Sequence, residues 1–354
     1  MARQLDLPRD FQALRALSAR VGADSLLVQG PGGNTSIKHE GVLWVKASGT
    51  WLANALDKDI FVPVRLDPLL EAVASGDERA EKAADFVLAE QNPSGLRPSI
   101  ETTFHAVMPQ RVVVHVHCVE TISVAVRRDA REIVAERLEG LNWAFAPYAR
   151  PGLPLTRAIL QELKPETDML VLGNHGLVVA ADAVDAAEAL LAEVSGRLRQ
   201  PVRVAPPADL DALRVLAASS PYHLPRFEGA HAAATDAISC RCAVGGSLYP
   251  DHVIFLGPGS VLARADETAA GIAARAQEAG AEPPAAILFP GRGVLVREDA
   301  TAGAEALALC LADVTARIPE NTPLRYLSDV ENAELLDWDA EKYRQAMARR
   351  GGHA

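Results

Sequence analysis

The sequence has little cysteine, no cluster of basic residues and no long apolar run. The four cysteines, Cys118, Cys240, Cys242 and Cys310, form no Cys-x-x-Cys motif. A disulfide framework or a structural zinc knuckle is therefore not expected. This use of cysteine fits a reducing compartment, and we expect a cytoplasmic protein.

The charge balance argues against two classes of partner. The formal net charge is -11 at pH 7 and no block of lysine and arginine reverses it, which argues against a nucleic-acid-binding surface. No run of about 18 apolar residues occurs, and the N-terminus has no apolar core of signal-peptide length, so neither a membrane span nor a secretory signal is expected. An anionic substrate would have to be held locally, by backbone amides and a few cations.

The sequence does contain histidines at the ends of apolar runs. Residues 111–118 read Arg-Val-Val-Val-His-Val-His-Cys, a β-branched run typical of a buried strand. Side chains two apart on a strand share a face and lie about 7 Å apart, so His115 and His117 can bind one metal ion. His175 follows a second apolar run, within Leu-Gly-Asn-His-Gly. Three histidines leave a coordination position for substrate, as catalytic zinc requires, although a buried histidine is often only a hydrogen-bonded core residue.

Glu101 precedes the histidine strand, near a predicted helix start in Arg-Pro-Ser-Ile-Glu-Thr-Thr-Phe-His. A carboxylate beside an open metal site can act as a general base. The alternative is that Glu101 only complements the helix dipole. His105 lies one turn later on the same helix face, where it would either orient Glu101 or fill the core.

Two turns of small residues occur at 32–36, Gly-Gly-Asn-Thr-Ser, and at 48–50, Ser-Gly-Thr. Backbone N–H groups, hydroxyls and an amide in such turns can bind anions. Neither turn matches a nucleotide-binding glycine motif, and most such turns only reverse the chain. With Ser99 beside the candidate base, they suggest a phosphate-sized pocket near the metal.

Strands alternate with helices along the chain, which favours a layered α/β fold. Extended segments are predicted at 37–45, 111–118, 168–172 and 177–180, and helices at 11–21, 67–90 with a break at Gly76, 100–107, 119–140, 155–163 and 182–199. A proline-rich break at 199–209 predicts a catalytic domain over residues 1–205 and a C-terminal α/β extension over residues 206–354.

The extension is weakly similar in sequence to part of the catalytic domain. Residues 287–300 align without gaps on residues 170–183, and Ala-Glu-Ala-Leu occurs at both 187–190 and 304–307. Arg292 then takes the position of His175. The extension is either a degenerate half-repeat that has lost its metal ligand, with Arg292 as a possible anion contact, or a chance similarity between two alanine-rich units.

Taken together, the motifs resemble the class II aldolase/adducin family in order and spacing across residues 9–200. The resemblance rests on Gly-Gly-Asn-Thr-Ser, Ser-Gly-Thr, Ser-Ile-Glu-Thr-x-x-His, Val-Val-His-Val-His, Ala-Pro-Tyr-Ala and Gly-Asn-His-Gly-Leu. It implies a three-layer α/β/α fold and a homo-oligomer, most often a tetramer, with active sites near subunit interfaces. It also implies a divalent metal, usually zinc.

Residue by residue, the resemblance implies that Glu101 is the acid/base group and that the metal ligands are His115, His117 and His175. The substrate phosphate would be held by Gly33, Asn34, Ser48, Gly49 and Ser99. The implied reaction belongs to carbohydrate metabolism: reversible cleavage of a phosphorylated ketose to dihydroxyacetone phosphate and an aldehyde, through a metal-stabilised enediolate. One of the two serines that bind phosphate in small sugar-phosphate aldolases is replaced by Ile100, which leaves the phosphate position open.

The C-terminal part is similar to the aldolase half of bifunctional rhamnulose-1-phosphate aldolase/alcohol dehydrogenase proteins, on Leu-Tyr-Pro-Asp-His-Val-Ile at 248–254 and Pro-Gly-Arg-Gly at 290–293. No dinucleotide-binding glycine signature follows residue 330, so we expect a stand-alone aldolase half. His252 is either a site residue of this subfamily or a core or surface histidine.

Three alternatives remain open. The same metal could serve a decarboxylase of a 3-oxo acid phosphate or a dehydratase of a ketose phosphate, because all three reactions begin by polarising a carbonyl. A third possibility is a non-catalytic adducin-like interaction module. Adducin-type domains lose the metal histidines, whereas this chain keeps three histidines and the glutamate.

Overall fold

A mixed seven-stranded sheet forms the centre of the first unit in the computed structural model, which describes residues 7–339, 341–343 and 346–347. The strand order is β3-β2-β1-β4-β7-β6-β5, and every neighbouring pair is antiparallel except β5 and β6. The strands are β1 (Asn34–His39), β2 (Val42–Lys46), β3 (Phe61–Arg65), β4 (Val112–Val116), β5 (Trp143–Ala146), β6 (Met169–Leu172) and β7 (Gly176–Ala181).

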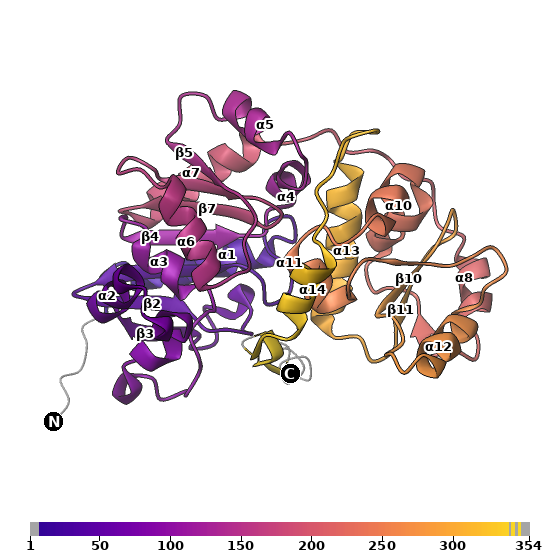
Figure 1. Ribbon diagram of the computed structural model, residues 1–354, viewed down its shortest axis with the longest axis horizontal. Coiled ribbons are helices and arrows are strands. Elements are labelled where there is room, and N and C mark those ends of the chain that lie inside the picture. The colour runs from indigo at the N-terminus through magenta and orange to yellow at the C-terminus, as the bar shows by residue number, and fades with distance from the viewer. Residues whose placement is uncertain (1–6, 340, 344–345, 348–354) are drawn as a thin grey trace.

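Helices cover both faces of this sheet (Figure 1). The alternation of β4 explains the arrangement, since Val112 and Val114 pack into one core with α1 (Phe11–Ala23) and α7 (Val184–Arg197). Val113 faces the other side, where two further helices close a second core. Helices α2 (Leu66–Ser75), α3 (Thr102–Val107) and α6 (Leu153–Glu162) lie on that second face. The predicted three-layer α/β/α fold is confirmed.

Three local predictions were wrong in detail. The extended segment at 37–45 is a hairpin of β1 and β2, which reverses at Glu40 (φ 46°) and Gly41 (φ 74°), a left-handed pair typical of two-residue hairpin turns. The helix expected over 67–90 breaks at Gly76 as predicted, but it does not resume, and the chain continues in short 3₁₀ turns, η2 (Glu78–Glu81), η3 (Ala83–Phe86) and η4 (Ala89–Gln91). The helix expected over 119–140 is two helices, α4 (Val119–Ala125) and α5 (Ala130–Arg137).

The second unit is built on a four-stranded sheet of order β8-β11-β10-β9. Its strands are β8 (Tyr222–His223), β9 (Val261–Leu262), β10 (Ala286–Phe289) and β11 (Gly293–Arg297). One face packs against α9 (Ala232–Thr235), α10 (Ala237–Val244), α11 (Pro250–Leu256) and α13 (Ala302–Ala316). The other face packs against α8 (Leu210–Ala217) and α12 (Ala269–Glu278). Helix α14 (Asp329–Leu336) follows and packs against α11 (Figure 1).

The second sheet repeats part of the first in order and direction. Strands β10 and β11 occupy the positions that the gap-free alignment places opposite β6 and β7. The order β8-β11-β10-β9 corresponds to β4-β7-β6-β5, with an antiparallel outer pair, an antiparallel hairpin and a parallel last pair in both. The similarity therefore reaches beyond the residues that align in sequence.

The two units share a buried contact. Val119 and Ile122 of α4 belong to the same apolar core as Leu307 and Leu311 of α13. An ion pair within this contact joins Glu120 Oε1 to Arg317 Nε at 3.0 Å, with both side chains largely buried. Because apolar and charged groups from both units are buried together, their relative position is fixed by packing.

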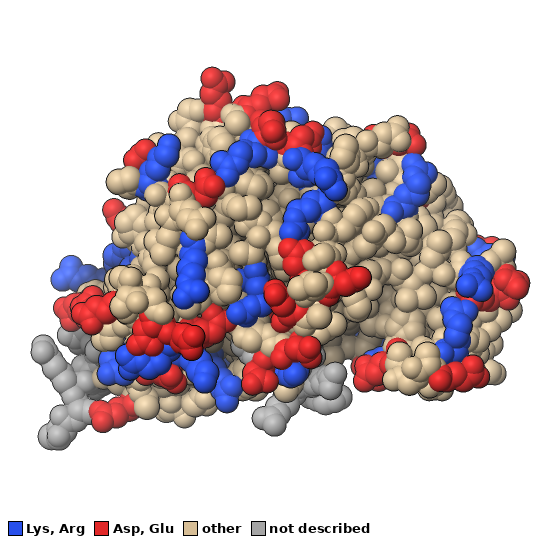
Figure 2. Space-filling model, viewed as in Figure 1, with Lys and Arg blue, Asp and Glu red and all other residues tan. Residues whose placement is uncertain are grey.

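The surface agrees with the charge pattern of the sequence. Figure 2 shows acidic and basic side chains interspersed over one face of the molecule, without a block of a single sign. Among the residues that the structure describes, no helix combines the length and the apolar character needed to cross a membrane.

Candidate metal centre

The structure brings the three predicted histidines together. His115 is the fourth residue of β4, His117 follows the end of that strand, and His175 lies in the turn between β6 and β7. Strands β4 and β7 are neighbours, so the end of one strand meets the turn of the other. One ring nitrogen from each residue lies within 4.8 Å of the others, and all three side chains are buried. The spacing that suggested a metal ion therefore corresponds to one cluster.

The hydrogen bonds of these rings leave nitrogen lone pairs without a partner. His115 Nδ1 lies 3.0 Å from the Leu177 carbonyl, which only accepts, so Nδ1 carries the proton and Nε2 the lone pair. His117 Nδ1 donates to Asp251 Oδ2 at 2.9 Å, which likewise leaves Nε2 as the acceptor. Neither Nε2 atom, nor Nδ1 of His175, has a hydrogen-bond partner. Buried polar atoms without partners are rare, and a divalent metal ion would satisfy all three rings.

The electrostatics also suit metal binding. Burial lowers the pKa of His115 to about 4 and that of His175 to about 3, although the attraction of Glu101 opposes both shifts. Burial raises the pKa of Glu101, but the neighbouring histidines and the Asn34 amide outweigh it and lower that pKa to about 2. At neutral pH the two imidazoles are therefore neutral, as metal ligands must be, and Glu101 is ionised.

Glu101 is held at the cluster by a chain of polar side chains. Its Oε1 lies 3.3 Å from His175 Nε2, and its Oε2 lies 3.5 Å from His115 Nε2. Asn34 Nδ2 donates to Glu101 Oε2 at 2.7 Å, and Asn34 Oδ1 accepts from His105 Nε2. His105 acts on Glu101 through Asn34 and not by direct contact.

The predicted phosphate residues line a cavity beside the cluster. Gly33, Asn34, Ser48, Gly49 and Ser99 border it, together with Glu101, His117 and His175. Ser48 Oγ is buried and has no hydrogen-bond partner, so it can still donate to a ligand. Asn34 differs from the expectation, because its Nδ2 already donates to Ser99 Oγ and to Glu101. Its amide N–H groups hold the candidate base in place.

Gly33 is required by the close packing of this turn. It adopts φ 58°, and a Cβ atom at this position would lie 2.9 Å from the His115 carbonyl oxygen. Only glycine allows the turn to approach the strand that carries the metal ligands. The glycine-rich turn is therefore a wall of the site.

Three charged residues that line the cavity were not found from the sequence, namely Lys46, Asp251 and Glu341. Lys46 lies on β2 and donates to the carbonyls of Pro31 and Gly33, each at 2.9 Å. Asp251 and Glu341 come from the second unit and from the segment after α14, and both are at most 2% exposed. A lysine in an otherwise apolar strand was a signal for Lys46, whereas Asp251 and Glu341 are distant in sequence.

The segment around Glu341 is fastened to the first unit by aromatic contacts. The Arg150 guanidinium lies 4.1 Å from the ring centre of Trp338, and the Arg97 guanidinium lies 4.4 Å from that of Tyr343. Such cation–π contacts stabilise by about 0.5–2 kcal/mol each. They flank Glu341 and hold it at the cavity.

Two other candidate residues, His252 and Arg292, lie away from the histidine cluster. His252 is fully buried in the second unit, where it accepts from the Leu248 N–H at 3.3 Å and lies 3.3 Å from Ser260 Oγ. Burial lowers its pKa to about 4. His252 is therefore a core residue, which agrees with the second of the two interpretations given for it from the sequence. Arg292 is exposed in the turn between β10 and β11.

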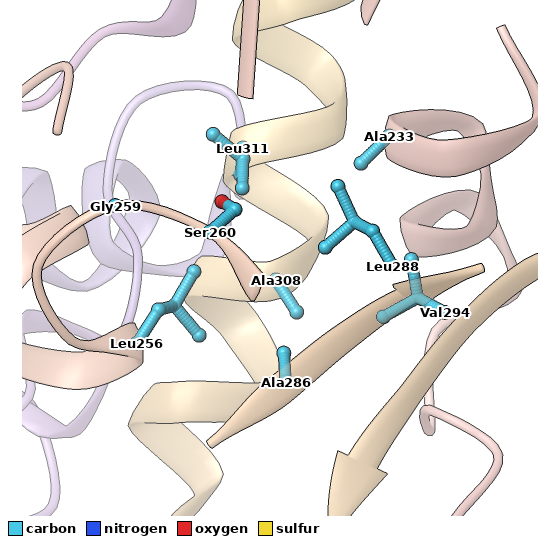
Figure 3. Close-up of a pocket in the computed structure, with 9 residues that line it drawn as sticks. All are labelled: Ala233, Leu256, Gly259, Ser260, Ala286, Leu288, Val294, Ala308 and Leu311. Carbon is cyan, nitrogen blue, oxygen red and sulfur yellow. The ribbon is translucent and has the colours of Figure 1, made fainter. Parts of the chain in front are cut away.

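A second cavity lies in the other unit and has a different character. Figure 3 shows Leu256, Leu288 and Leu311 around it, and alanine and valine side chains complete most of the wall. The Ser260 hydroxyl, which lies 3.3 Å from His252 Nε2, is the polar side chain among those drawn. This cavity offers no titratable or metal-binding group, so the chemistry of the described residues gathers at the histidine cluster.

Comparison with known proteins identifies the first unit. A profile described as "Class II Aldolase and Adducin N-terminal domain" matches residues 12–200. Among curated proteins, an "Uncharacterized oxidoreductase YuxG" of Bacillus subtilis (strain 168) is 30% identical over 191 residues, which are 50% of this chain. The match spans 27% of that protein's length, so the chain corresponds to about a quarter of it.

Solved structures resemble the same region. The N-terminal class II aldolase domain of a conserved protein from Thermoplasma acidophilum is 29% identical with a TM-score of 0.47, and the match covers 55% of this chain and 95% of that one. L-fuculose-1-phosphate aldolase from Thermus thermophilus is 17% identical with a TM-score of 0.34, over 58% of this chain and 98% of that one.

Proposed function

Because this chain belongs to the class II aldolase and adducin family, we propose that it is a metal-dependent carbon–carbon lyase that cleaves a phosphorylated ketose to dihydroxyacetone phosphate and an aldehyde. The observation that carries the proposal is the cluster of three buried imidazoles, each with a nitrogen free of hydrogen bonds, two of which lie within 3.5 Å of the carboxylate of Glu101. An adducin-like binding module has no need of such a cluster.

The donor set fits zinc, held by His115, His117 and His175, with a coordination position left for substrate. When bound, the metal would supply a Lewis acid for the negative charge that develops on the substrate oxygens. A carboxylate alone cannot stabilise that charge, so the metal and Glu101 have separate tasks.

Glu101 is the proposed acid/base group. It is 4% exposed, and its pKa of about 2 keeps it ionised at neutral pH. In the condensation direction the carboxylate removes a proton from the carbon beside the ketone of dihydroxyacetone phosphate. In the cleavage direction the carboxylate takes the proton of the hydroxyl on the carbon that becomes the aldehyde, and delivers it to the enediolate carbon after the carbon–carbon bond has broken. Asn34 and, behind it, His105 fix the carboxylate for both transfers.

The phosphate is proposed to lie against the two small-residue turns. Ser48 has an unused hydroxyl there, and Ser99 accepts from Asn34 Nδ2 and from the Glu101 N–H, which leaves its own hydroxyl hydrogen for a ligand. Gly33 and Gly49 allow the backbone to approach. Lys46 supplies positive charge and ties the first turn to β2. Asn34 contributes through its hold on Ser99 and Glu101.

The setting of the enzyme is part of the same proposal. We expect a cytoplasmic homo-oligomer, with a tetramer favoured, that acts on small molecules and not on nucleic acid or membranes. The mixed surface charge in Figure 2 supports the second part. Size measurement by light scattering checks the first.

The experiment is to load the purified protein with Zn²⁺ and incubate it with a panel of ketose 1-phosphates. Release of dihydroxyacetone phosphate is followed by its enzymatic reduction. Release that needs both metal and Glu101 supports the aldolase. Carbon dioxide from a 3-oxo acid phosphate, or loss of water from a ketose phosphate, would replace it with a decarboxylase or a dehydratase. A protein that binds no divalent metal would contradict all three reactions.

A further inference from the structure

Asp251 joins the second unit to the metal centre. It lies in the first turn of α11, and its Oδ2 is 2.9 Å from Nδ1 of His117, which belongs to the first unit. The two side chains are 2% and 7% exposed, so water does not compete for this contact. A buried carboxylate that accepts from one nitrogen of an imidazole fixes the ring's orientation and its tautomer.

The start of α11 is itself held in position. Pro250 occupies the first helical turn, which suits its fixed φ. The residue before Tyr249, Leu248, donates its N–H to His252 and accepts from Asn174 Nδ2 at 2.9 Å. Because these bonds fix both sides of the helix start, Asp251 is presented to His117 by a rigid element.

The first unit leaves room for this contact. A Cβ atom on Gly32 would lie 2.8 Å from His117 Nδ1 and 3.1 Å from Asp251 Oδ2, both closer than ordinary packing allows. Gly32 therefore leaves the space in which the hydrogen bond between His117 and Asp251 forms.

A second ligand is braced from the same side. Asn174, next to His175, adopts φ 53° and donates to the carbonyls of Leu248 and Arg325, at 2.9 and 2.7 Å. The Arg325 guanidinium returns a bond to Asn174 Oδ1 at 3.3 Å. Thus the second unit contacts one metal ligand directly and the neighbour of another.

We propose that Asp251 is a positioning residue of the metal centre, and that the second unit therefore completes the site of the first unit. Asp251 keeps the lone pair of His117 Nε2 directed at the metal and makes the ring a stronger donor. The inference rests on the proposed function only in requiring a metal ion at the three histidines. Carboxylates in this position typically contribute a 10–100-fold gain in metal affinity.

The test measures metal affinity and not only activity. The full chain and Asp251→Asn are titrated with Zn²⁺ against a chromogenic chelator, and the Co²⁺ forms are compared by visible absorption. We expect about 10–100-fold weaker Zn²⁺ binding and a changed Co²⁺ spectrum in the variant. Glu305→Gln is the matched control, because Glu305 is also a 2% exposed carboxylate of the second unit but binds the Arg226 N–H instead of a ligand histidine.

Wild-type affinity and spectrum in a folded Asp251→Asn protein would overturn the proposal, as would an equal loss in Glu305→Gln. If Asp251→Asn does not fold, Gly32→Ala disturbs the same contact sterically from the first unit, and unchanged Zn²⁺ binding in that variant would overturn it. If the wild-type protein itself binds no metal, the proposed function fails first. Metal binding with Asp251 irrelevant leaves that function standing.

Discussion

The β6–β7 and β10–β11 hairpins have connecting loops of the same length but opposite chemistry. Asn174 in the first turn and Gly291 in the second both adopt the left-handed conformation, with φ 53° and 71°. The residue that follows is a buried histidine in one and an exposed arginine, Arg292, in the other. Similar turns therefore carry a candidate metal ligand in the first unit and a surface residue in the second.

The neighbouring strand explains why the second copy cannot bind a metal in the same way. In the first unit Val179 pairs with Val114, and in the second the corresponding Val296 pairs with His223. His223 thus takes the place of a residue that points away from the cluster. Continuing the register puts Leu224 and Arg226 where the first unit has His115 and His117. A metal site of this kind needs ligands from the hairpin and from the neighbouring strand at matching positions. A repeated hairpin alone does not supply them.

The largest effect is expected when the first hairpin receives the second hairpin's residue. His175→Arg places a permanent cation beside the other two histidines, so metal content should fall from about one per chain to near zero, and lyase activity should be lost with it. Elemental analysis of the purified protein checks this.

Arg292→His is the reciprocal control for that exchange. It restores a histidine to the second turn without the partners on the neighbouring strand, so metal content should not rise. A second metal ion bound by Arg292→His would contradict the conclusion that the second hairpin lacks partner ligands on its neighbouring strand.

A separate change distinguishes the metal from the base within the first unit. Glu101→Gln keeps the shape of the side chain and its bond to Asn34 but removes the proton acceptor. Metal content should stay unchanged, while kcat falls by roughly 10²–10⁴-fold. Stopped assays of dihydroxyacetone phosphate measure the rate. If kcat is retained, another group transfers the proton.

The second unit should be sensitive to acid through His252. This buried histidine has a pKa of about 4, below the usual 6.5, so the folded state binds fewer protons than the unfolded state. The stability from His252 is present above pH 6.5 and is lost as the pH falls toward 4, by up to about 3 kcal/mol. Urea unfolding at pH 7, 5.5 and 4.5 should show a weaker pH dependence for His252→Asn than for the wild type. Parallel curves would contradict this.

The smallest effect is expected at Glu341, a second-unit carboxylate beside the proposed phosphate turns. Glu341→Gln removes a negative charge from the cavity, so KM for a phosphorylated substrate should fall by a few fold, corresponding to about 1 kcal/mol. Glu334→Gln, at an exposed position of α14, is the control and should leave KM unchanged. An increase of KM in Glu341→Gln would show that this side chain binds substrate hydroxyls instead of opposing a phosphate.

The sequence was sufficient for the residues whose positions follow from local periodicity. Strand alternation placed His115 and His117 on one face, and the short turn before β7 placed His175 at the end of a strand. Asp251 could not be found in this way, because its contact depends on how two units pack. On α11 consecutive side chains point about 100° apart, so Asp251 faces His117 while its neighbour His252 turns back to Leu248.

The hairpin at 40–41 was missed for a different reason. Glu-Gly is not the Asn-Gly or Asp-Gly pair that marks such turns, so the sequence carries no strong turn signal between the two strands. In the structure the chain turns here because Glu40 and Gly41 both adopt positive φ angles. Tertiary pairing of β1 with both β2 and β4 decides the local conformation here.

We propose that the first unit holds one catalytic metal ion, at a site that Asp251 of the second unit completes. X-ray diffraction from crystals of the Zn²⁺-loaded protein, recorded on both sides of the zinc absorption edge, tests it most directly. We expect a single strong anomalous peak among the ring nitrogens of His115, His117 and His175, with Asp251 hydrogen-bonded to the other ring nitrogen of His117. The absence of a peak there, or a peak at the turn that carries Arg292, would contradict it.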